Sequence, residues 1–166
     1  MWKIIIMLQK SLLPNKYKKP GWLLLVLGAL LWVLVLIYGD GSIPLDTKMF
    51  AIVYGDLIKD TRYFTFVDMN ISNSLAGILF IAGALLVIFS KEKNEDEFIS
   101  NLRQSSLLWA VLVNYILLLC AFLFIHGMAF LDVMLYNMFT VLIIFIARFY
   151  YVLYRNAKSM SREKYN

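Results

Sequence analysis

The sequence predicts an all-α membrane protein, a four-helix transmembrane bundle with both termini in the cytoplasm. Three observations lead to this fold class. The 166-residue chain is 61% hydrophobic and 16% charged, whereas a soluble domain is nearer to half apolar and a quarter charged. Its apolar residues fall into four blocks that are long enough to cross a bilayer. Its Lys and Arg residues gather on one side of these blocks.

The four apolar blocks are the expected membrane spans. None contains a carboxylate, and Arg148 in the fourth is their one fixed charge. Together with an extracytoplasmic loop and a cytoplasmic loop they form a single membrane domain over residues 1–166. The spans cover residues 22–38, 71–89, 105–126 and 133–154, and the loops cover 39–70 and 90–104.

The first block has a competing explanation as a cleaved signal peptide. Its basic lead, Met1–Pro20, is long, and no A-x-A-like cleavage site follows the block. We therefore interpret it as a retained span. Residues 1–13 ahead of it are either an amphipathic anchor in the inner interface or an unordered leader. The basic cluster in residues 15–20 is suited to anionic lipid head groups.

The distribution of Lys and Arg predicts the orientation. Three of these residues flank the spans on one side, namely Lys48, Lys59 and Arg62. Since Lys and Arg are enriched in cytoplasmic segments, the opposite, richer side is expected to be cytoplasmic. The net charge of +5 then reflects topology and gives no reason to expect a nucleic-acid partner. The richer side holds twelve: Lys3, Lys10, Lys16, Lys18, Lys19, Lys91, Lys93, Arg103, Arg155, Lys158, Arg162 and Lys164.

The first loop contains an apolar segment, residues 48–59, that we expect to form a short helix capped by Asp46 or Thr47. The aromatic residues 62–70 after it are more extended in character. The loop is expected to rest on the outer head-group region, where aromatic side chains are common. A lid or a ligand-sensing cap is the alternative interpretation.

The third span is expected to begin ahead of the membrane. Asn94 followed by Glu97 resembles a capping box, and acids in a first helical turn suit the helix dipole. The predicted helix has about 33 residues and a cytoplasmic overhang of about 16 Å. Its charged side chains form a candidate interaction surface: Glu95, Asp96, Glu97 and Arg103.

Polar residues recur on one side of the fourth span. With Asn114 they define a candidate intramembrane polar site: Asn114, Asn137, Thr140 and Arg148. An ionisable residue in a span is a functional hypothesis by default, here a pore or substrate path. The structural interpretation has Arg148 stacked on Trp109 and the two Asn side chains bonded across the helices.

Small residues predict close helix packing in the second and third spans. In the second span they are Ala76, Gly77, Gly83 and Ala84, and in the third Ala110, Asn114 and Ala121 share a face.

Motifs for catalysis are missing from the sequence. It contains no Gly-rich phosphate loop, G-x-S-x-G or H-E-x-x-H pattern, so we predict no catalytic residue and no cofactor. His126 and Asp132 flank the last turn and could meet, but two ligands are too few to predict a metal site. Cys120, the single cysteine, excludes dithiol redox chemistry within the chain.

The second half of the chain resembles a known family. The stretches EDEFISNLRQSSLLWAVLVNY (95–115) and NMFTVLIIFIARFYYVLYR (137–155) are similar to small uncharacterised bacterial four-helix inner-membrane proteins with an E-D-E-x-I-x-x-L-R-x-x-S-L-x-W-A-x-x-x-N-Y pattern. That family has no established activity, and its members are often encoded beside a small helix-turn-helix regulator. The resemblance implies an inner-membrane location and a possible regulatory setting. The matching residues are Glu95, Asp96, Glu97, Ile99, Leu102, Arg103, Ser106, Leu107, Trp109, Ala110, Asn114 and Tyr115.

These observations favour a non-enzymatic integral membrane protein that acts through protein interaction, as an anchor, sensor or regulatory subunit. Its partners would be the lipid bilayer, a cytoplasmic or membrane protein, and further copies of itself. The alternative is a small oligomeric transporter or channel with a path near Asn114, Asn137 and Arg148. A membrane enzyme is the third hypothesis.

Overall fold

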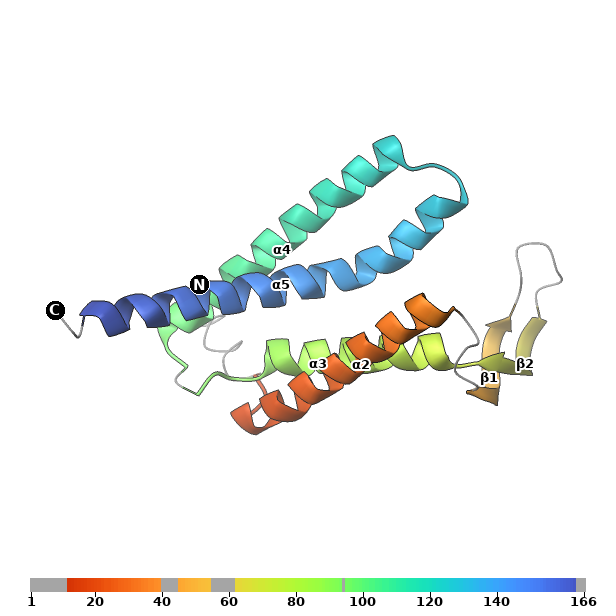
Figure 1. Cartoon of the computed structure of the whole chain (residues 1–166), viewed down its shortest axis with the longest axis horizontal. Helices are drawn as coiled ribbons and strands as arrows, with labels where there is room; N and C mark the ends of the chain where they lie inside the picture. Colours follow the sequence, from red (N-terminus) through yellow and green to blue (C-terminus); the bar gives the residue numbers. More distant parts are fainter. Residues whose placement is uncertain (1–11, 40–44, 55–61, 94, 164–166) are drawn as a thin grey trace. The chain divides into compact units, whose positions relative to one another are not determined.

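The computed structural model describes residues 12–39, 45–54, 62–93 and 95–163, and it is mostly helical (Figure 1). Most of the predicted N-terminal anchor, residues 1–11, lies outside the described part. The elements in chain order are η1 (Asn15–Tyr17), α2 (Lys18–Tyr38), β1 (Asp46–Tyr54), β2 (Arg62–Asn70), α3 (Ser72–Phe89), α4 (Glu97–Phe124) and α5 (Met128–Glu163).

Four helices of the described chain are long and apolar enough to cross a membrane. This confirms the prediction of four helices that are long and apolar enough to span. In the third of them α4 ends at Phe124, with Ile125 as its C-cap, two residues before the end of the predicted span. The contacts divide the chain into two compact units, residues 1–22 with 84–166 and residues 23–83. The single membrane domain stays a prediction.

The helix predicted for residues 48–59 is wrong over residues 48–54, so the chain is mostly helical with one pair of strands. Residues 55–59 lie outside the described part. Residues 46–54 instead form β1, which pairs antiparallel with β2 from Asp46↔Asn70 to Tyr54↔Arg62. Both segments are rich in aromatic and β-branched residues, which are favoured on a pleated surface. A helix of about twelve residues is marginal without tertiary support, whereas each strand here gains cross-strand pairs such as Phe50↔Phe66.

Small residues bring α2 and α3 close together within residues 23–83. A Cβ atom added to Gly28 would lie 2.5 Å from the backbone nitrogen of Phe80. Ala76 is fully buried in the same unit, and Phe80 is 7% exposed. The close approach expected from small residues in the second span is confirmed, and Gly28 is the residue on the facing helix that permits it.

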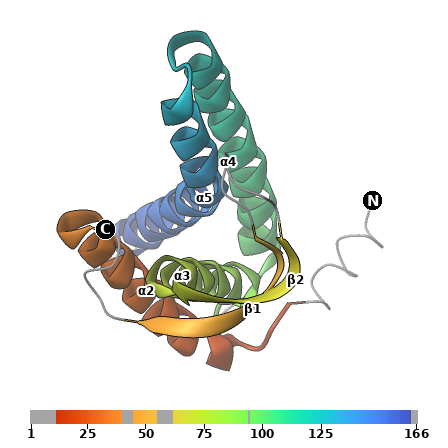
Figure 2. The ribbon, with the colours of Figure 1, turned by 90° about the vertical axis from the view of Figure 1, so that its right-hand side faces the viewer.

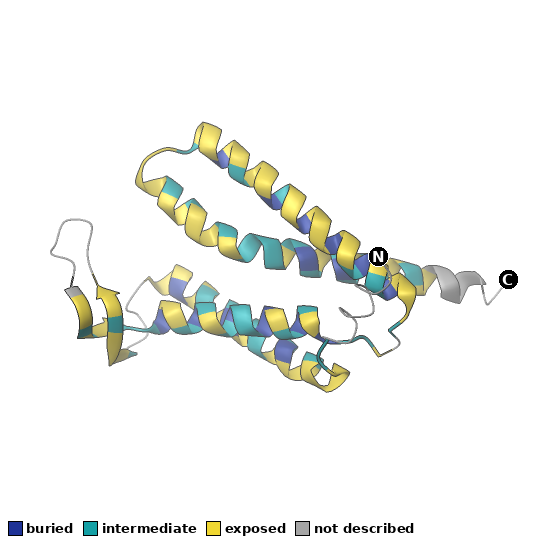
Figure 3. Cartoon of the chain, turned by 180° about the vertical axis from the view of Figure 1, so that it is seen from behind, coloured by how far each residue is buried: buried dark blue, intermediate teal, exposed yellow. Residues whose placement is uncertain are grey.

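The core of the other unit lies between α4 and α5, which form an antiparallel hairpin. Figure 3 shows the buried positions on the facing sides of these helices and exposed positions over most of the rest. The hairpin turns at Gly127, whose φ of +74° suits a residue without a Cβ atom. The buried apolar cluster consists of Ile99, Leu102, Ala110, Phe145 and Phe149.

Candidate functional site

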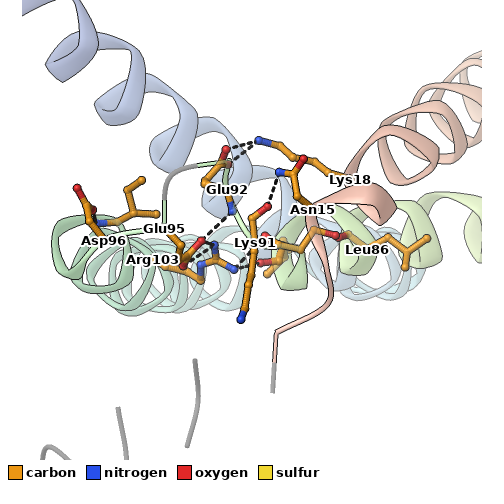
Figure 4. Close-up of polar contacts among 11 residues, drawn as sticks. Asn15, Lys18, Leu86, Lys91, Glu92, Glu95, Asp96 and Arg103 are labelled. Atoms are coloured by element: carbon orange, nitrogen blue, oxygen red, sulfur yellow. Dashed lines mark hydrogen bonds and ion pairs between the residues drawn. The ribbon is translucent and has the colours of Figure 1, made fainter. Parts of the chain in front are cut away.

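Charged residues gather where the chain leaves α3 and enters α4: they come from the loop between these helices, from the first turns of α4 and from the start of α2. We call this set the junction cluster and define it as Lys18, Glu92, Glu95 and Arg103. The backbone is tied at the same place, since Leu13 N donates to Phe89 O and Lys91 N donates to Leu13 O, each at 2.9 Å. Asn15 Nδ2 adds a bond of 2.6 Å to Lys91 O (Figure 4).

Arg103 holds the C-terminal end of α3 from its position on α4. Its Nη1 atom donates to Ile88 O at 2.9 Å and to Ser90 O at 3.2 Å. The last carbonyl groups of a helix have no partner inside the helix and carry partial negative charge. A guanidinium group with several donors suits this position, so Arg103 acts as a side-chain cap for α3.

The same guanidinium group pairs with an acid and stacks on a ring. Nη2 of Arg103 lies 3.2 Å from both carboxylate oxygens of Glu95, and its central carbon lies 5.5 Å from the ring centroid of Phe149. Only 14% of the Arg103 side chain and 13% of the Glu95 side chain are exposed. The pair is therefore shielded from solvent, and salt weakens such a buried ion pair less than an exposed one.

Lys18 repeats this arrangement at the start of α2. Its Nζ atom lies 2.6 Å from Glu92 Oε1 and 4.9 Å from the ring centroid of Tyr150. Trp22 packs on the same Tyr150 ring at 5.3 Å. Each cation of the junction cluster thus contacts both a carboxylate from the loop and an aromatic ring from α5. Figure 4 shows the two ion pairs.

The start of α4 differs from the capping box that the sequence predicts. Asp96 is the N-cap, and its Oδ1 atom accepts a hydrogen bond of 2.8 Å from Ile99 N. Asn94 lies outside the described residues. Glu95 belongs to the loop and accepts a bond from Glu92 N at 2.7 Å, so it cannot serve the first turn. The helix has 28 residues and is shorter than predicted, because its cap is Asp96 rather than Asn94 and its last residue is Phe124 rather than residue 126.

The candidate interaction surface is accordingly divided in two. Glu95 and Arg103 turn inward and pair with each other. Asp96 and Glu97 are exposed, and so is the neighbouring Lys93.

The candidate intramembrane polar site is held together by a reciprocal amide pair. Asn114 Nδ2 donates to Asn137 Oδ1, and Asn137 Nδ2 donates to Asn114 Oδ1, both at 3.1 Å. Asn114 is 3% exposed. Thr140 turns back on its own helix and donates to Tyr136 O at 3.1 Å. The predicted bond between the two Asn residues across the helices is confirmed.

Arg148 lies apart from the Asn pair. Its guanidinium carbon lies 4.6 Å from the ring centroid of Trp109, as the sequence predicts. Its Nη2 atom also lies 3.4 Å from Ser105 Oγ. An arginine stacked on Trp with a hydroxyl acceptor nearby has partners for its charge inside a helical hairpin.

A metal site receives no support within the described part of the chain, which holds no group of three or more His, Cys, Asp or Glu residues able to bind a metal ion. His126 and Asp132 are both exposed.

Sequence reasoning did not find Lys18 and Glu92 of the junction cluster, nor Tyr150, which Lys18 contacts. Lys18 was counted as one of the positive charges that orient the chain, and Tyr150 lies in an aromatic run of the fourth span. The available signal was the pair of adjacent aromatic residues in α5. The ring of Phe149 contacts Arg103, and the ring of Tyr150 contacts Lys18.

The described part of the chain is thus mostly helical, with four helices that could cross a membrane, which is consistent with a multi-pass membrane protein. Comparisons with protein-family models, with curated proteins and with solved structures found no match for it.

Proposed function

We propose that this chain is a non-enzymatic integral membrane protein that acts through protein interaction, as an anchor, sensor or regulatory subunit. Its spans form a four-helix bundle in the inner membrane of a bacterium, and both termini lie in the cytoplasm. The excess of Lys and Arg on one side supports the orientation. The resemblance of residues 95–115 to small bacterial inner-membrane proteins supports the location.

The observation that carries this proposal is how the junction cluster positions the exposed charges beside it. Arg103 and Lys18 fix the loop that contains Glu92 and Glu95. Lys93, directly after Glu92, and Glu97, two residues after Glu95, are exposed. A charged surface held on a fixed backbone loses little conformational entropy on binding, which favours a specific protein contact.

The intramembrane polar groups support packing better than transport. Asn114 and Asn137 each satisfy the other's amide, and Arg148 has Trp109 and Ser105 as partners. A solute path would need polar groups that face a water-filled space. We therefore keep protein interaction as the proposed function.

Site-specific photo-cross-linking in native membranes tests this proposal. A photoreactive amino acid replaces Lys93 or Glu97 in the full-length chain, and Leu108, which is 66% exposed on α4, serves as the matched control. We expect a discrete protein adduct from positions 93 and 97, and predominantly lipid adducts from position 108.

The charge reversal Glu97→Lys, with the photoreactive residue at position 93, provides the second arm. We expect it to reduce the protein adduct several-fold without changing the amount of inserted protein. Lipid adducts alone from positions 93 and 97, or an adduct indifferent to the charge at 97, would refute an interaction at this surface.

A further inference from the structure

The β1–β2 hairpin has an apolar face that no described residue of its own compact unit covers. Cross-strand partners lie on the same face of a sheet, so Phe50 and Phe66 share one face with Ile52. The Phe50 ring contacts Phe66 at 5.4 Å and Phe64 at 6.3 Å between centroids. We call these four residues the aromatic face; they are 52% (Phe50), 62% (Ile52), 71% (Phe64) and 72% (Phe66) exposed.

Phe64 joins this face through an unusual backbone conformation. Its φ is +50°, in the left-handed region that bulky residues rarely adopt. The strand register steps from Ala51↔Thr65 to Val53↔Tyr63 around it. Such a conformation persists only where the surroundings enforce it, and it is found most often at binding and switch sites. Here its effect is a third phenyl ring beside Phe50.

The hairpin is joined directly to a helix that could cross a membrane. Ile71 N donates to Leu45 O at 3.1 Å, which closes the base of the hairpin. The backbone N–H of Ser72, the first residue of α3, donates to Oδ1 of Asn70 in β2 at 2.9 Å. If α3 spans a bilayer, its first residue lies near the membrane surface, and the hairpin begins there.

The direction of the strands also suits a membrane surface. Figures 1 and 2 show β1 and β2 running across the direction of α3 rather than continuing it. Strands that cross the axis of a spanning helix lie along the plane of the bilayer. One face of the hairpin can then meet lipid while the other meets water.

The two faces differ in their aromatic side chains, while the charged residues Asp46, Lys48 and Asp68 lie on the aromatic face, at its end nearest α3. The aromatic face carries three phenyl rings and an isoleucine. Lys48 and Asp68, cross-strand partners on the same face toward α3, are suited to head groups. The opposite face carries one ring, that of Tyr63, and mixes apolar side chains with two threonines: Thr47, Met49, Ala51, Val53, Tyr63, Thr65, Val67 and Met69.

We infer that the aromatic face inserts into the interfacial region of the bilayer that α3 crosses. The occupant of this face is therefore lipid, at the boundary between head groups and acyl chains, where amphipathic elements with aromatic side chains bind. This inference rests on the membrane insertion in the proposed function, but not on the interaction surface at the other end of α3.

Spin labels on adjacent residues of β1 test the inference. In the full chain with Cys120→Ala, single cysteines replace Ile52 on the aromatic face or Val53 on the opposite face; these side chains are 62% and 59% exposed. Leu108→Cys on α4 is the control for insertion. Each labelled protein is reconstituted in phosphatidylethanolamine–phosphatidylglycerol vesicles, and collision rates with oxygen and with a water-soluble nickel chelate are measured.

We expect the ratio of oxygen to nickel collisions to be several-fold higher at position 52 than at position 53. The double variant Phe50→Ser/Phe66→Ser should bring the ratio at position 52 down to that at position 53. The matched double variant Met49→Ser/Tyr63→Ser on the opposite face should leave it unchanged.

Two outcomes would overturn the inference. Equally high nickel access at positions 52 and 53 would place both faces in water. Spin–spin broadening at position 52 that disappears on dilution with unlabelled chain would assign the face to a second copy. If Leu108 also shows no lipid exposure, the proposed membrane insertion fails as well, so the two failures are distinguishable.

Discussion

Arg103 on α4 and Glu95 in the preceding loop form an ion pair with Nη2 3.2 Å from the carboxylate, and both side chains are more than four-fifths buried. The same guanidinium group donates to two carbonyl groups at the end of α3. One side chain therefore connects the end of one helix, the loop and the start of the next. Lys18 and Glu92 repeat the arrangement with a second α5 ring.

Replacing Arg103 should destabilise the protein more than replacing an exposed arginine. Arg103→Ala leaves a shielded carboxylate and two helix-end carbonyls without their donor, and we expect a loss of about 3 kcal/mol in the free energy of unfolding. Arg103→Lys should recover only part of it, because an ammonium group lacks the fork geometry. Reversible unfolding in mixed micelles measures the change.

Arg155→Ala on the exposed side of α5 is the matched control and should change stability by less than about 0.5 kcal/mol. A double-mutant cycle with Glu95→Ala should yield a coupling energy of at least about 1 kcal/mol. Additive effects of the two substitutions would contradict the pairing.

The Asn114–Asn137 pair should act as a unit in stability. Asn114→Leu leaves the Asn137 amide unpaired between apolar helices, and we expect a cost of about 1 kcal/mol. Asn114→Leu/Asn137→Leu should cost less than the sum of the single changes, because no amide is then left unpaired. Unfolding of all three variants under the same conditions provides the comparison.

Thr140→Val is the control for the same helix, since its hydroxyl bonds only to the Tyr136 carbonyl of α5. It should be nearly neutral. If vesicles showed a solute flux that the double Asn variant abolished without loss of folded protein, transport would replace packing as the role of this pair.

Two glycines should respond differently to alanine. At Gly28 a Cβ atom would lie 2.5 Å from the Phe80 nitrogen and 2.9 Å from its Cα atom, so Gly28→Ala should cost about 3 kcal/mol through overpacking. At Gly127 nothing lies within 4 Å, but φ is +74°, so Gly127→Ala should cost about 1 kcal/mol through backbone strain.

Gly127→Asn separates the two causes, because Asn tolerates the left-handed region better than Ala. It should unfold at a higher temperature than Gly127→Ala. Equal melting temperatures for the alanine variants at 28 and 127 would contradict the close contact of α2 with α3.

The N-cap of α4 should be detectable at one amide. Asp96→Ala removes the acceptor for Ile99 N, and we expect a loss of about 1 kcal/mol in the local stability of the first turn. Hydrogen exchange at Ile99 should accelerate about fivefold. Asp96→Ser should retain most of the protection, because a hydroxyl also caps.

Glu97→Gln keeps the cap and changes only an exposed charge, so the Ile99 amide should exchange within about twofold of the wild-type rate. Faster exchange in Glu97→Gln than in Asp96→Ala would show that Asp96 is not the N-cap of α4.

Patterns that repeat along one helix were predictable from the sequence. Four apolar blocks imply four helices, because a chain in lipid must satisfy its backbone hydrogen bonds internally. Residues at matching heights in an antiparallel hairpin were also predictable, and Arg148 does stack on Trp109. In both cases the helical repeat and a single turn determine which residues meet.

The choice between a helix and a hairpin in residues 46–70 depended on pairing between segments that are distant in sequence. β1 alone contains a weak helical pattern, and its strand conformation follows only from its register with β2. The cap at Asp96 was missed for a similar reason. Once Arg103 and the Glu92 amide engage Glu95, the helix can begin only after it.

Hydropathy and the 3.6-residue repeat thus determined that the chain has four membrane-length helices and where each lies, because these properties are local. Tertiary structure decided which charges pair. Lys18 and Glu92 are 74 residues apart, and they meet only when the start of α2 and the end of α3 come together beside α5. It also decided that an aromatic loop became a hairpin with one phenyl-rich face, because a strand exists only with its partner.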